Sequence, residues 1–254
     1  MQNFVPHAYR IECLSNLHAG SGDNNYGVID KQVQRDSISL LPVIHASGLK
    51  GAFREYFEKA VKLFDPKKTE IIFGSGKDSK DNMQQGSFRF LEARLLSIPV
   101  RGVDKEPFYR ATTSRLIEDF NRMSENFGSN YKILTSSALA EKAKTEFGEA
   151  SIHSAIKEIG EKPVFFNEDM MKDVVQHLPV IARNSLDNGQ SENLWYEEIV
   201  PRESIFFFFV LSSSDTDNTT DFENDFNKNV DGKMIQIGAN ATVGYGCCKL
   251  TKLF

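Results

Sequence analysis

The heptapeptide Ile205–Leu211 reads IFFFFVL and is the longest uninterrupted apolar run in this chain of 254 residues. A helix that crosses a membrane needs about 20 apolar residues, so this run is too short for one. A short apolar run of this kind is typical of a buried strand. We therefore expect a strand inside a folded core at 205–211, with the other elements arranged around it.

Hydrophobic periodicity elsewhere predicts both helices and strands. The clearest helix covers residues 47–64, where apolar side chains recur every three or four positions, and Ser47 is its expected N-cap. A second amphipathic helix is expected at 112–127. Further short helices are expected at 136–147, 168–175 and 222–230, and extended segments at 9–13, 28–36, 87–96, 234–237 and 247–250.

Two extended stretches, 180–186 and 191–198, flank an Asn188-Gly189 pair, which is a strong signal for a β-hairpin. The hairpin carries Arg183 and the only tryptophan, Trp195. Aromatic side chains beside basic ones can stack on RNA bases, although an ordinary sheet hairpin explains the pattern equally well. Since no βα period repeats, we predict an α+β fold with helices on one face of an antiparallel sheet.

Composition narrows the class of protein. Three cysteines, Cys13, Cys247 and Cys248, form no C-x-x-C pair, which disfavours a disulfide framework or a thiolate zinc site and favours the cytoplasm. Residues 1–7 lack a basic region and a long apolar stretch, so we expect no signal peptide. The net charge of −5 argues against a free-standing nucleic-acid binder, but six acids lie within 215–233, and the remaining body can still carry a phosphate-binding face.

Two loops are candidate anion sites. Ser47-Gly48-Leu49-Lys50-Gly51 opens the first helix, where free N–H groups and the helix dipole favour an anion. The glycine-rich loop 238–246 lets a backbone approach a phosphate closely. Alternatively, the first is a capped helix with a solvated lysine and the second an irregular connection. Arg54 can pair with Glu58 instead of binding a ligand.

His18 lies near three carboxylates, Asp23, Asp30 and Asp36, around another glycine-rich loop. An imidazole with carboxylates can perform acid-base chemistry or hold a divalent cation. Alternatively, Asp23 caps a turn and His18 packs inside the protein or faces solvent. The other histidines show no ligand spacing.

Several blocks taken together resemble the RAMP superfamily of CRISPR effector subunits, and more narrowly the repeated backbone subunit of type III-B (Cmr) complexes. These blocks are HAGSG at 18–22, GVIDKQVQRD at 27–36, PVIHASGLKGAFR at 42–54, the stretch 86–101, LWYEEIVP at 194–201 and IGANATVGYG at 237–246. They occur in order over nearly the whole chain.

The resemblance implies a ferredoxin-like (RRM-like) palm with a β-hairpin thumb and helical insertions, in a single RAMP domain over 1–254. The palm would be formed by the N- and C-terminal parts, the insertions would lie at about 65–86 and 128–176, and the thumb at about 178–198. Several copies would bind one CRISPR RNA as a filament with other Cmr subunits and cleave complementary target RNA at regular intervals. The reaction would be metal-dependent, with Mg²⁺ or Mn²⁺.

The same resemblance implies roles for individual residues. Asp30 falls on the family's catalytic aspartate and would also hold the metal, and His18 falls on its loop histidine. Tyr196 and Glu198 lie in a block that the family implicates in catalysis. The expected RNA-binding residues are Ser47, Lys50, Arg54, Arg183, Trp195, Gly238, Asn240, Thr242, Gly244, Tyr245 and Gly246.

Four other functions compete with this one. The chain could be the equivalent subunit of a type III-A (Csm) complex, a non-catalytic RNA-binding scaffold, or a guide-processing endonuclease that cuts as a monomer. An enzyme acting on a small phosphate compound is disfavoured, since neither glycine-rich loop has a nucleotide-binding fingerprint.

Overall fold

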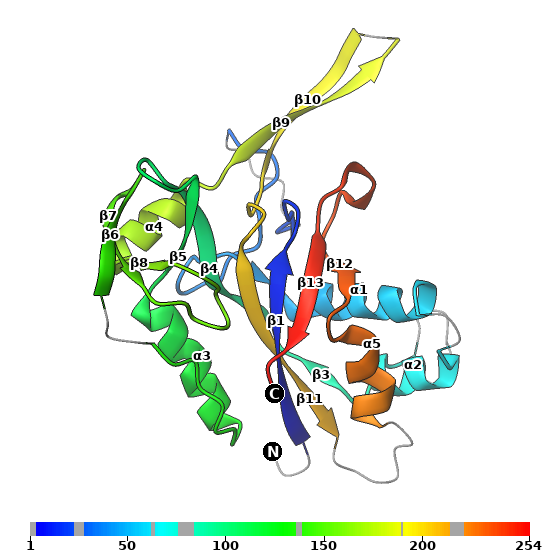
Figure 1. Cartoon of the computed structure of the whole chain (residues 1–254). Coiled ribbons are helices and arrows are strands. Elements are labelled where there is room, and N and C mark those ends of the chain that lie inside the picture. The colour runs from blue at the N-terminus through cyan, green and yellow to red at the C-terminus, as the bar shows by residue number, and fades with distance from the viewer. Residues whose placement is uncertain are drawn as a thin grey trace.

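The computed structural model describes residues 4–22, 28–61, 64–75, 84–135, 139–188, 190–213 and 221–254. Its strands and helices alternate irregularly around one large sheet, which confirms the α+β class (Figure 1). Within this part of the chain, no helix is long and apolar enough to cross a membrane.

The elements follow one another in a fixed order along the chain. The strands are β1 (Phe4–Cys13), β2 (Val43–Ile44), β3 (Arg89–Phe90), β4 (Ala93–Arg101), β5 (Phe108–Thr112), β6 (Leu139–Thr145), β7 (Gly148–His153), β8 (Pro163–Phe165), β9 (Val180–Asp187), β10 (Gln190–Glu198), β11 (Ile205–Ser213), β12 (Met234–Gln236) and β13 (Cys247–Lys252). The helices are α1 (Ala46–Lys59), α2 (Pro66–Phe73), α3 (Ser114–Asn126), α4 (Glu168–Gln176) and α5 (Lys228–Val230), with a π-helical turn at Phe222–Asn227 and a 3₁₀ turn at Ala241–Val243.

The large sheet has the strand order β12-β13-β1-β11-β4-β5-β8-β7-β6, with β2 paired to β4 and β3 to β11. Its pairs are antiparallel except for β5 and β8, which run parallel. The fully antiparallel sheet expected from the sequence is therefore wrong at this one pair. β11, the apolar run, lies between β1 and β4 at the centre of the palm.

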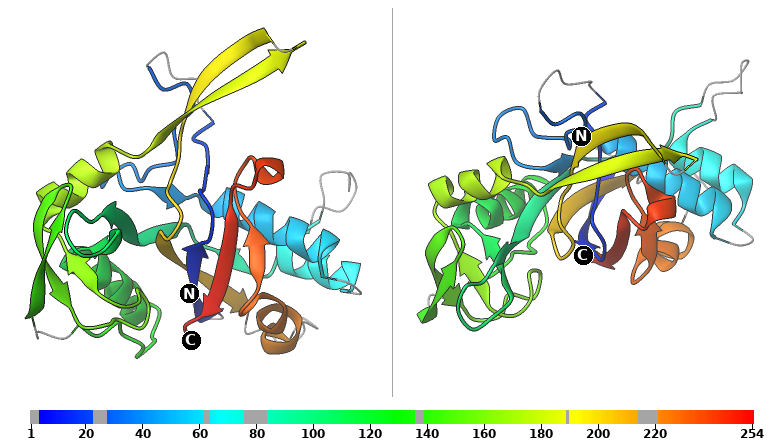
Figure 2. Two further views of the ribbon diagram at one scale, coloured as in Figure 1. Left: turned by 45° about the horizontal axis from the view of Figure 1, so that its top comes forward. Right: turned by 90° about the horizontal axis from the view of Figure 1, so that it is seen from above.

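Both faces of β11 are buried. Phe206 and Phe208 belong to the core cluster that includes Phe53 of α1, whereas Phe207 and Phe209 belong to a second cluster that includes Phe120 of α3. Successive side chains of a strand point to opposite faces, so an uninterrupted apolar run supplies both cores at once. The expectation of helices on one face only is wrong, because α1 and α3 cover opposite faces (Figure 2).

The expected helix at 136–147 is also wrong. Residues 139–145 form β6, which pairs with β7, and residues 136–138 lie outside the described part of the chain. Ala143 and Thr145 are buried while Lys142 and Lys144 are exposed, which is the two-residue period of a strand. The insertion expected at about 128–176 therefore contains three strands, β6 to β8, before its helix α4.

Other expectations agree closely with the structure, with small shifts at element ends. α1 begins at Ala46 with His45 at the N-cap, so Ser47 lies in the first turn and is not the cap. The segment expected as one strand at 87–96 is split into β3 and β4. The helices expected at 112–127 and 168–175 are present as α3 and α4.

The predicted hairpin is present as β9 and β10, which form a separate two-stranded sheet. It projects away from the palm and crosses above it (Figures 1 and 2). Asn188 adopts a left-handed conformation with φ 48° in the turn, which asparagine tolerates better than most residues. Its partner Gly189 lies outside the described residues.

Because β11 is packed on both sides, truncation on either face should be equally harmful. We expect Phe207→Ala and Phe208→Ala each to lower the free energy of unfolding by about 3–5 kcal/mol, measured by urea denaturation of the isolated chain. Val243→Ala, at an exposed position, is the control and should change it by less than about 0.5 kcal/mol. A small effect at Phe207 alone would show that the α3 face is loosely packed.

Candidate functional site

Four segments of the chain meet at the base of the hairpin: the loop after β1, the segment 28–36, the end of β10 and the glycine-rich loop 238–246 (Figure 1). The amides of Asp30 and Lys31 both donate to the carbonyl of Tyr196, each at 3.1 Å. The amide of Ala239 donates to the carbonyl of His18 at 2.9 Å. The structure thus brings together residues that are more than 200 positions apart in sequence.

Asp30 lies at the surface of this junction. Its Oδ2 accepts a hydrogen bond from the amide of Tyr196 at 2.8 Å, so the carboxylate is held against the end of the hairpin. Within the described residues, Oδ1 has no hydrogen-bond partner. One oxygen therefore fixes the side chain while the other is available to a ligand.

Glu197, at the centre of the junction, was missed by the sequence reasoning. Its side chain is buried, with 1% of the residue exposed. Asn240 Nδ2 donates to Oε1 and Oε2 at 2.9 and 3.0 Å, Arg183 Nη1 donates to Oε2 at 3.3 Å, and His18 Nε2 lies 3.5 Å from Oε1. One carboxylate therefore joins the hairpin, the glycine-rich loop and the first loop. The only signal in the sequence was its place between two residues already singled out.

His18 is enclosed by these contacts. Only 4% of the residue is exposed, and its Nδ1 lies 2.7 Å from the carbonyl oxygen of Glu198. A Cβ placed on Gly20 would come within 2.9 Å of its Nε2, so this glycine leaves room for the imidazole. The environment makes His18 a residue that holds the loop in shape; its expected catalytic role stays a prediction.

Tyr196 and Glu198 lie beside Glu197 but face different surroundings. Glu198 is buried and accepts hydrogen bonds from the amide of Val33 at 3.0 Å and from Arg35 Nη2 at 2.5 Å. Its carboxylate therefore holds the segment 28–36 against the end of β10. Tyr196 is 40% exposed, and its contacts with Asp30 are made by its backbone amide and carbonyl.

Two cations and two aromatic rings lie together on the hairpin base, and we call Lys31, Arg183, Trp195 and Tyr245 the cation–aromatic cluster. Lys31 Nζ is 5.0 Å from the centre of the Trp195 ring. Arg183 Cζ is 5.9 Å from that ring and 5.5 Å from the ring of Tyr245. Cations within about 6 Å of an aromatic ring are attracted to its face. The indole N–H has no acceptor within the described residues, so Trp195 is held by its packing.

The glycine-rich loop is shaped by conformations that few residues adopt. Asn240 is left-handed at φ 64°, which asparagine accepts, and this turns its amide towards Glu197. A Cβ on Gly246 would lie 1.9 Å from the carbonyl oxygen of Ile237, so only glycine fits there. The amides of Ala239, Val243, Gly244, Tyr245 and Gly246 donate to carbonyls of the protein itself. Thr242 and Gly244 are exposed, and Gly238 packs against His18.

The other candidate anion site lies at the start of α1. Ser47 is exposed and borders a cavity of about 470 Å³ together with His45, Glu92 and Arg94. Lys50 is half-buried and has no ion pair within the described residues. Arg54 forms the alternative pair predicted with Glu58, since its Nε donates to Glu58 Oε1 at 2.7 Å.

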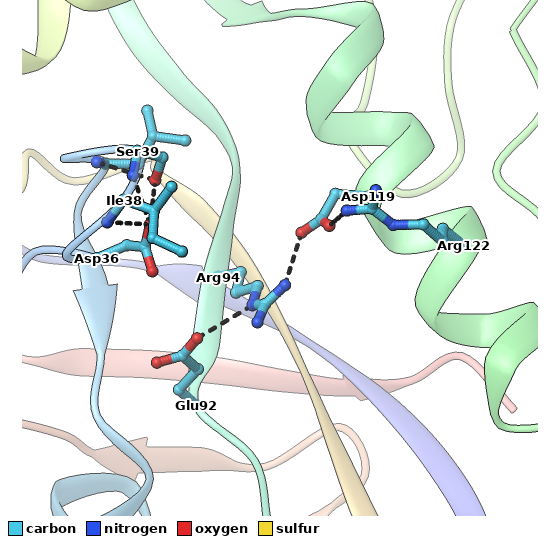
Figure 3. A network of polar contacts seen from close by, with 8 residues as sticks. Asp36, Ile38, Ser39, Glu92, Arg94, Asp119 and Arg122 are labelled. Carbon is cyan, nitrogen blue, oxygen red and sulfur yellow. Dashed lines mark hydrogen bonds and ion pairs between the residues drawn. The ribbon is translucent and has the colours of Figure 1, made fainter.

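Asp36 has a structural role (Figure 3). Its Oδ1 accepts hydrogen bonds from the amide and hydroxyl of Ser39, at 2.6 and 2.7 Å, and from the amide of Ile38. The bond from the Ser39 amide is the main cause that holds the pKa of Asp36 below its usual value. Arg94, which lines the same groove as Asp36, bridges Glu92 and Asp119. Asp23, the other candidate carboxylate, lies outside the described residues.

No group of three or more metal-ligating side chains occurs within the described ranges. Asp30 is therefore a single-carboxylate donor there. Mg²⁺ commonly binds through one or two carboxylates while phosphate oxygens and water complete its coordination. The donor set fits a cation that binds together with a phosphate-bearing ligand.

Comparisons with known proteins agree on one family. The model of the RAMP superfamily matches residues 10–249. The CRISPR system Cmr endoribonuclease Cmr4 of Pyrococcus furiosus is 30% identical over an alignment that covers 94% of this chain and 92% of that protein. The CRISPR system Cms endoribonuclease Csm3 of Enterococcus italicus is also 30% identical, over only 42% of this chain and 56% of that protein.

Solved structures show the same fold. A type III-B Cmr-beta structure bound to cognate target RNA matches with a TM-score of 0.79 at 22% identity, covering 99% of this chain and 98% of that one. A crystal structure of oligomeric Cmr4 from Pyrococcus furiosus matches with a TM-score of 0.70 at 23% identity, covering 97% of each chain.

If Glu197 joins the segments of the site, removing its charge should loosen them. We expect Glu197→Gln to lower the free energy of unfolding by about 1–3 kcal/mol, because the Arg183 guanidinium and the Asn240 amide lose a buried hydrogen-bond acceptor. Urea denaturation measures this. Glu192→Gln, at an exposed position of the same strand, is the matched control and should be neutral. Equal stabilities of the two variants would contradict the role assigned to Glu197.

Proposed function

The chain belongs to the RAMP superfamily and, within it, to the family of the Cmr4 endoribonuclease, and on this premise we propose that it is the repeated backbone subunit of a type III-B CRISPR effector complex. In this role it binds CRISPR RNA and cleaves complementary target RNA. The observation that carries the proposal is the exposed carboxylate of Asp30, fixed by the hairpin that projects beside it.

The proposal includes the partners of the subunit. One structural relative is bound to target RNA and another is an oligomer, which supports target RNA and further copies of this chain as partners. CRISPR RNA and other Cmr subunits complete the assembly. A cytoplasmic location is part of the proposal. The net charge of −5 is compatible with RNA binding because guide affinity would be shared among many subunits.

Cleavage would use the 2′-hydroxyl of the target RNA. A bond forms between the 2′-oxygen and phosphorus, the bond from phosphorus to the 5′-oxygen breaks, and one proton leaves the 2′-hydroxyl while another reaches the departing 5′-oxygen. The hairpin would displace a nucleotide, which lets the sugar reach in-line geometry. Asp30, with one carboxylate oxygen that accepts no hydrogen bond from the described residues, would accept a proton or position a cation.

We propose that the reaction depends on a divalent metal ion, Mg²⁺ or Mn²⁺. Asp30 would hold it, and the ion would supply relief of phosphate charge. Glu197 is unsuited as a second ligand because its oxygens already accept from Asn240 and Arg183. The remaining ligands would come from RNA phosphates and water.

The type III-A alternative has the support of Csm3, but that relative aligns with less than half of the chain, whereas Cmr4 aligns with nearly all of it. The chemistry would be the same in both complexes. A scaffold without activity would not need a carboxylate exposed at the hairpin base, and a cleavage assay separates the two.

The catalytic assignment is tested in the assembled complex. We expect Asp30→Ala to lower the rate of target cleavage by about 10²–10⁴-fold, the range for general acid-base assistance, and to leave assembly intact. Asp30→Asn, which keeps an acceptor for the Tyr196 amide, should be equally slow. Asp36→Asn is the control carboxylate variant and should cut normally. Wild-type cutting by Asp30→Ala would refute the assignment.

Guide binding is tested separately at Lys50. We expect Lys50→Ala to weaken CRISPR RNA binding and to make its dependence on salt shallower, because one fewer cation contacts phosphate. Binding measured at several salt concentrations gives the slope. Lys59→Ala, an exposed lysine at the other end of the same helix, serves as control. An unchanged slope for Lys50→Ala would argue against a phosphate contact there.

A further inference from the structure

We propose that Lys31 binds a phosphate of the target strand and so holds the scissile phosphodiester beside Asp30. This inference rests on the proposed function and deepens it by adding a positioning residue. Three features of the folded chain single out Lys31. Its ammonium group is exposed, its side chain lies over the ring of Trp195, and the preceding residue is Asp30.

The backbone of Lys31 is fixed at the junction. Its amide donates to the carbonyl of Tyr196 at 3.1 Å, and its own carbonyl accepts from the amide of Glu198 at 2.9 Å. The backbones of Lys31 and Glu197 also form an isolated parallel β-bridge. Both peptide groups of Lys31 are thus tied to the base of the hairpin. Asp30 Oδ2 accepts from the amide of Tyr196, and Lys31 Nζ lies 5.0 Å from the centre of the Trp195 ring, so both side chains contact neighbouring residues of β10.

The side chain of Lys31 is exposed and lies over an aromatic ring. Its Nζ is 5.0 Å from the centre of the Trp195 ring, and within the described residues it has no ion pair or hydrogen bond. Arg183, the other cation of the cation–aromatic cluster, differs because it donates to Glu197. Arg183 is therefore neutralised by Glu197, whereas no described residue neutralises the charge of Lys31.

An RNA phosphate suits this position better than a protein carboxylate. The ring limits the directions that the flexible lysine samples, which lowers the entropy lost when an anion binds. The preceding residue, Asp30, carries an exposed carboxylate, so an additional protein carboxylate at Lys31 would meet repulsion. A phosphodiester carries the same charge, but RNA also brings a 2′-hydroxyl that can donate to Asp30 or a cation that binds it, and either interaction offsets the repulsion.

The effect of Lys31 should fall on the reaction rate rather than on target affinity. Base pairing along the whole guide would supply most of the affinity, so one phosphate contact adds little. The rate of cleavage at one bond, in contrast, depends directly on how that phosphodiester is placed, because small misplacements strongly slow in-line attack. We therefore expect slower cleavage at saturating target with unchanged binding.

The experiment uses the complex assembled with guide and saturating target RNA under single-turnover conditions. Lys31→Met keeps the apolar cover of the indole and removes the charge, and we expect it to slow cleavage at least about tenfold. Lys31→Arg keeps the charge and should stay within about threefold of wild type. Lys233→Met, at an exposed lysine in the turn before β12, is the matched control and should cut as wild type.

Chemical substitution of the target then identifies the phosphate. Neutral methylphosphonate linkages are placed one at a time on either side of the cleavage position. At the phosphate that Lys31 contacts, the linkage should slow the wild-type complex but slow Lys31→Met no further, as expected for two changes that remove one interaction. Additive effects at every position would overturn the contact.

The outcomes separate this inference from the proposed function. If the wild-type complex does not cut target RNA, the proposed function fails. If wild type cuts and Asp30→Ala does not, but Lys31→Met cuts at the wild-type rate, only the role of Lys31 is overturned. A Lys31→Met variant that loses thermal stability or assembly to the same degree as activity would also overturn it, because Lys31 would then serve the fold alone.

Discussion

A single buried carboxylate organises the surface on which the proposed function depends. Glu197 accepts from Asn240 of the glycine-rich loop and Arg183 of the hairpin, and it lies beside His18 of the first loop. Because a buried charge is stable only when it is paired and hydrogen-bonded, the carboxylate of Glu197 constrains the positions of these three partners. Asp30 and Lys31 are fixed to the same strand end through the carbonyl of Tyr196. The chemistry proposed at the surface therefore depends on the arrangement that the buried carboxylate of Glu197 holds in place.

The palm supports this arrangement from below. The hairpin returns to the sheet through residues 199–204, where Leu17 bridges Val200 and the amide of Cys13 donates to the carbonyl of Ser204. The chain then enters β11, which is packed between two hydrophobic clusters. A strand confined on both faces has little freedom to shift, because every side chain is held by close packing. The hairpin is thus a projecting element on a rigid base.

Local sequence signals were reliable where a short stretch determines its own structure. The hairpin of β9 and β10, the helices α1, α3 and α4, and the buried strand at 205–211 were all predicted from their own residues. The signal misled at 139–145, where alanine, glutamate and lysine favour a helix in isolation, yet pairing with β7 and burial of Ala143 impose a strand. Helices on both faces of the sheet were also unexpected, because a continuous apolar run does not say what covers it.

The sequence by itself determined the class of fold, the family, and Asp30 with the glycine-rich loop as candidates, since these are properties of ordered local motifs. Only the tertiary structure decided that Glu197 and Glu198 are buried while Asp30 is exposed, and which partners each of the buried acids has. Glu197 and Glu198 are neighbours in the sequence but point to opposite sides of a strand, so one joins Asn240 and Arg183 while the other joins Arg35. The position of Lys31 over Trp195 likewise depends on a contact between segments far apart along the chain, which leaves no local pattern in the sequence.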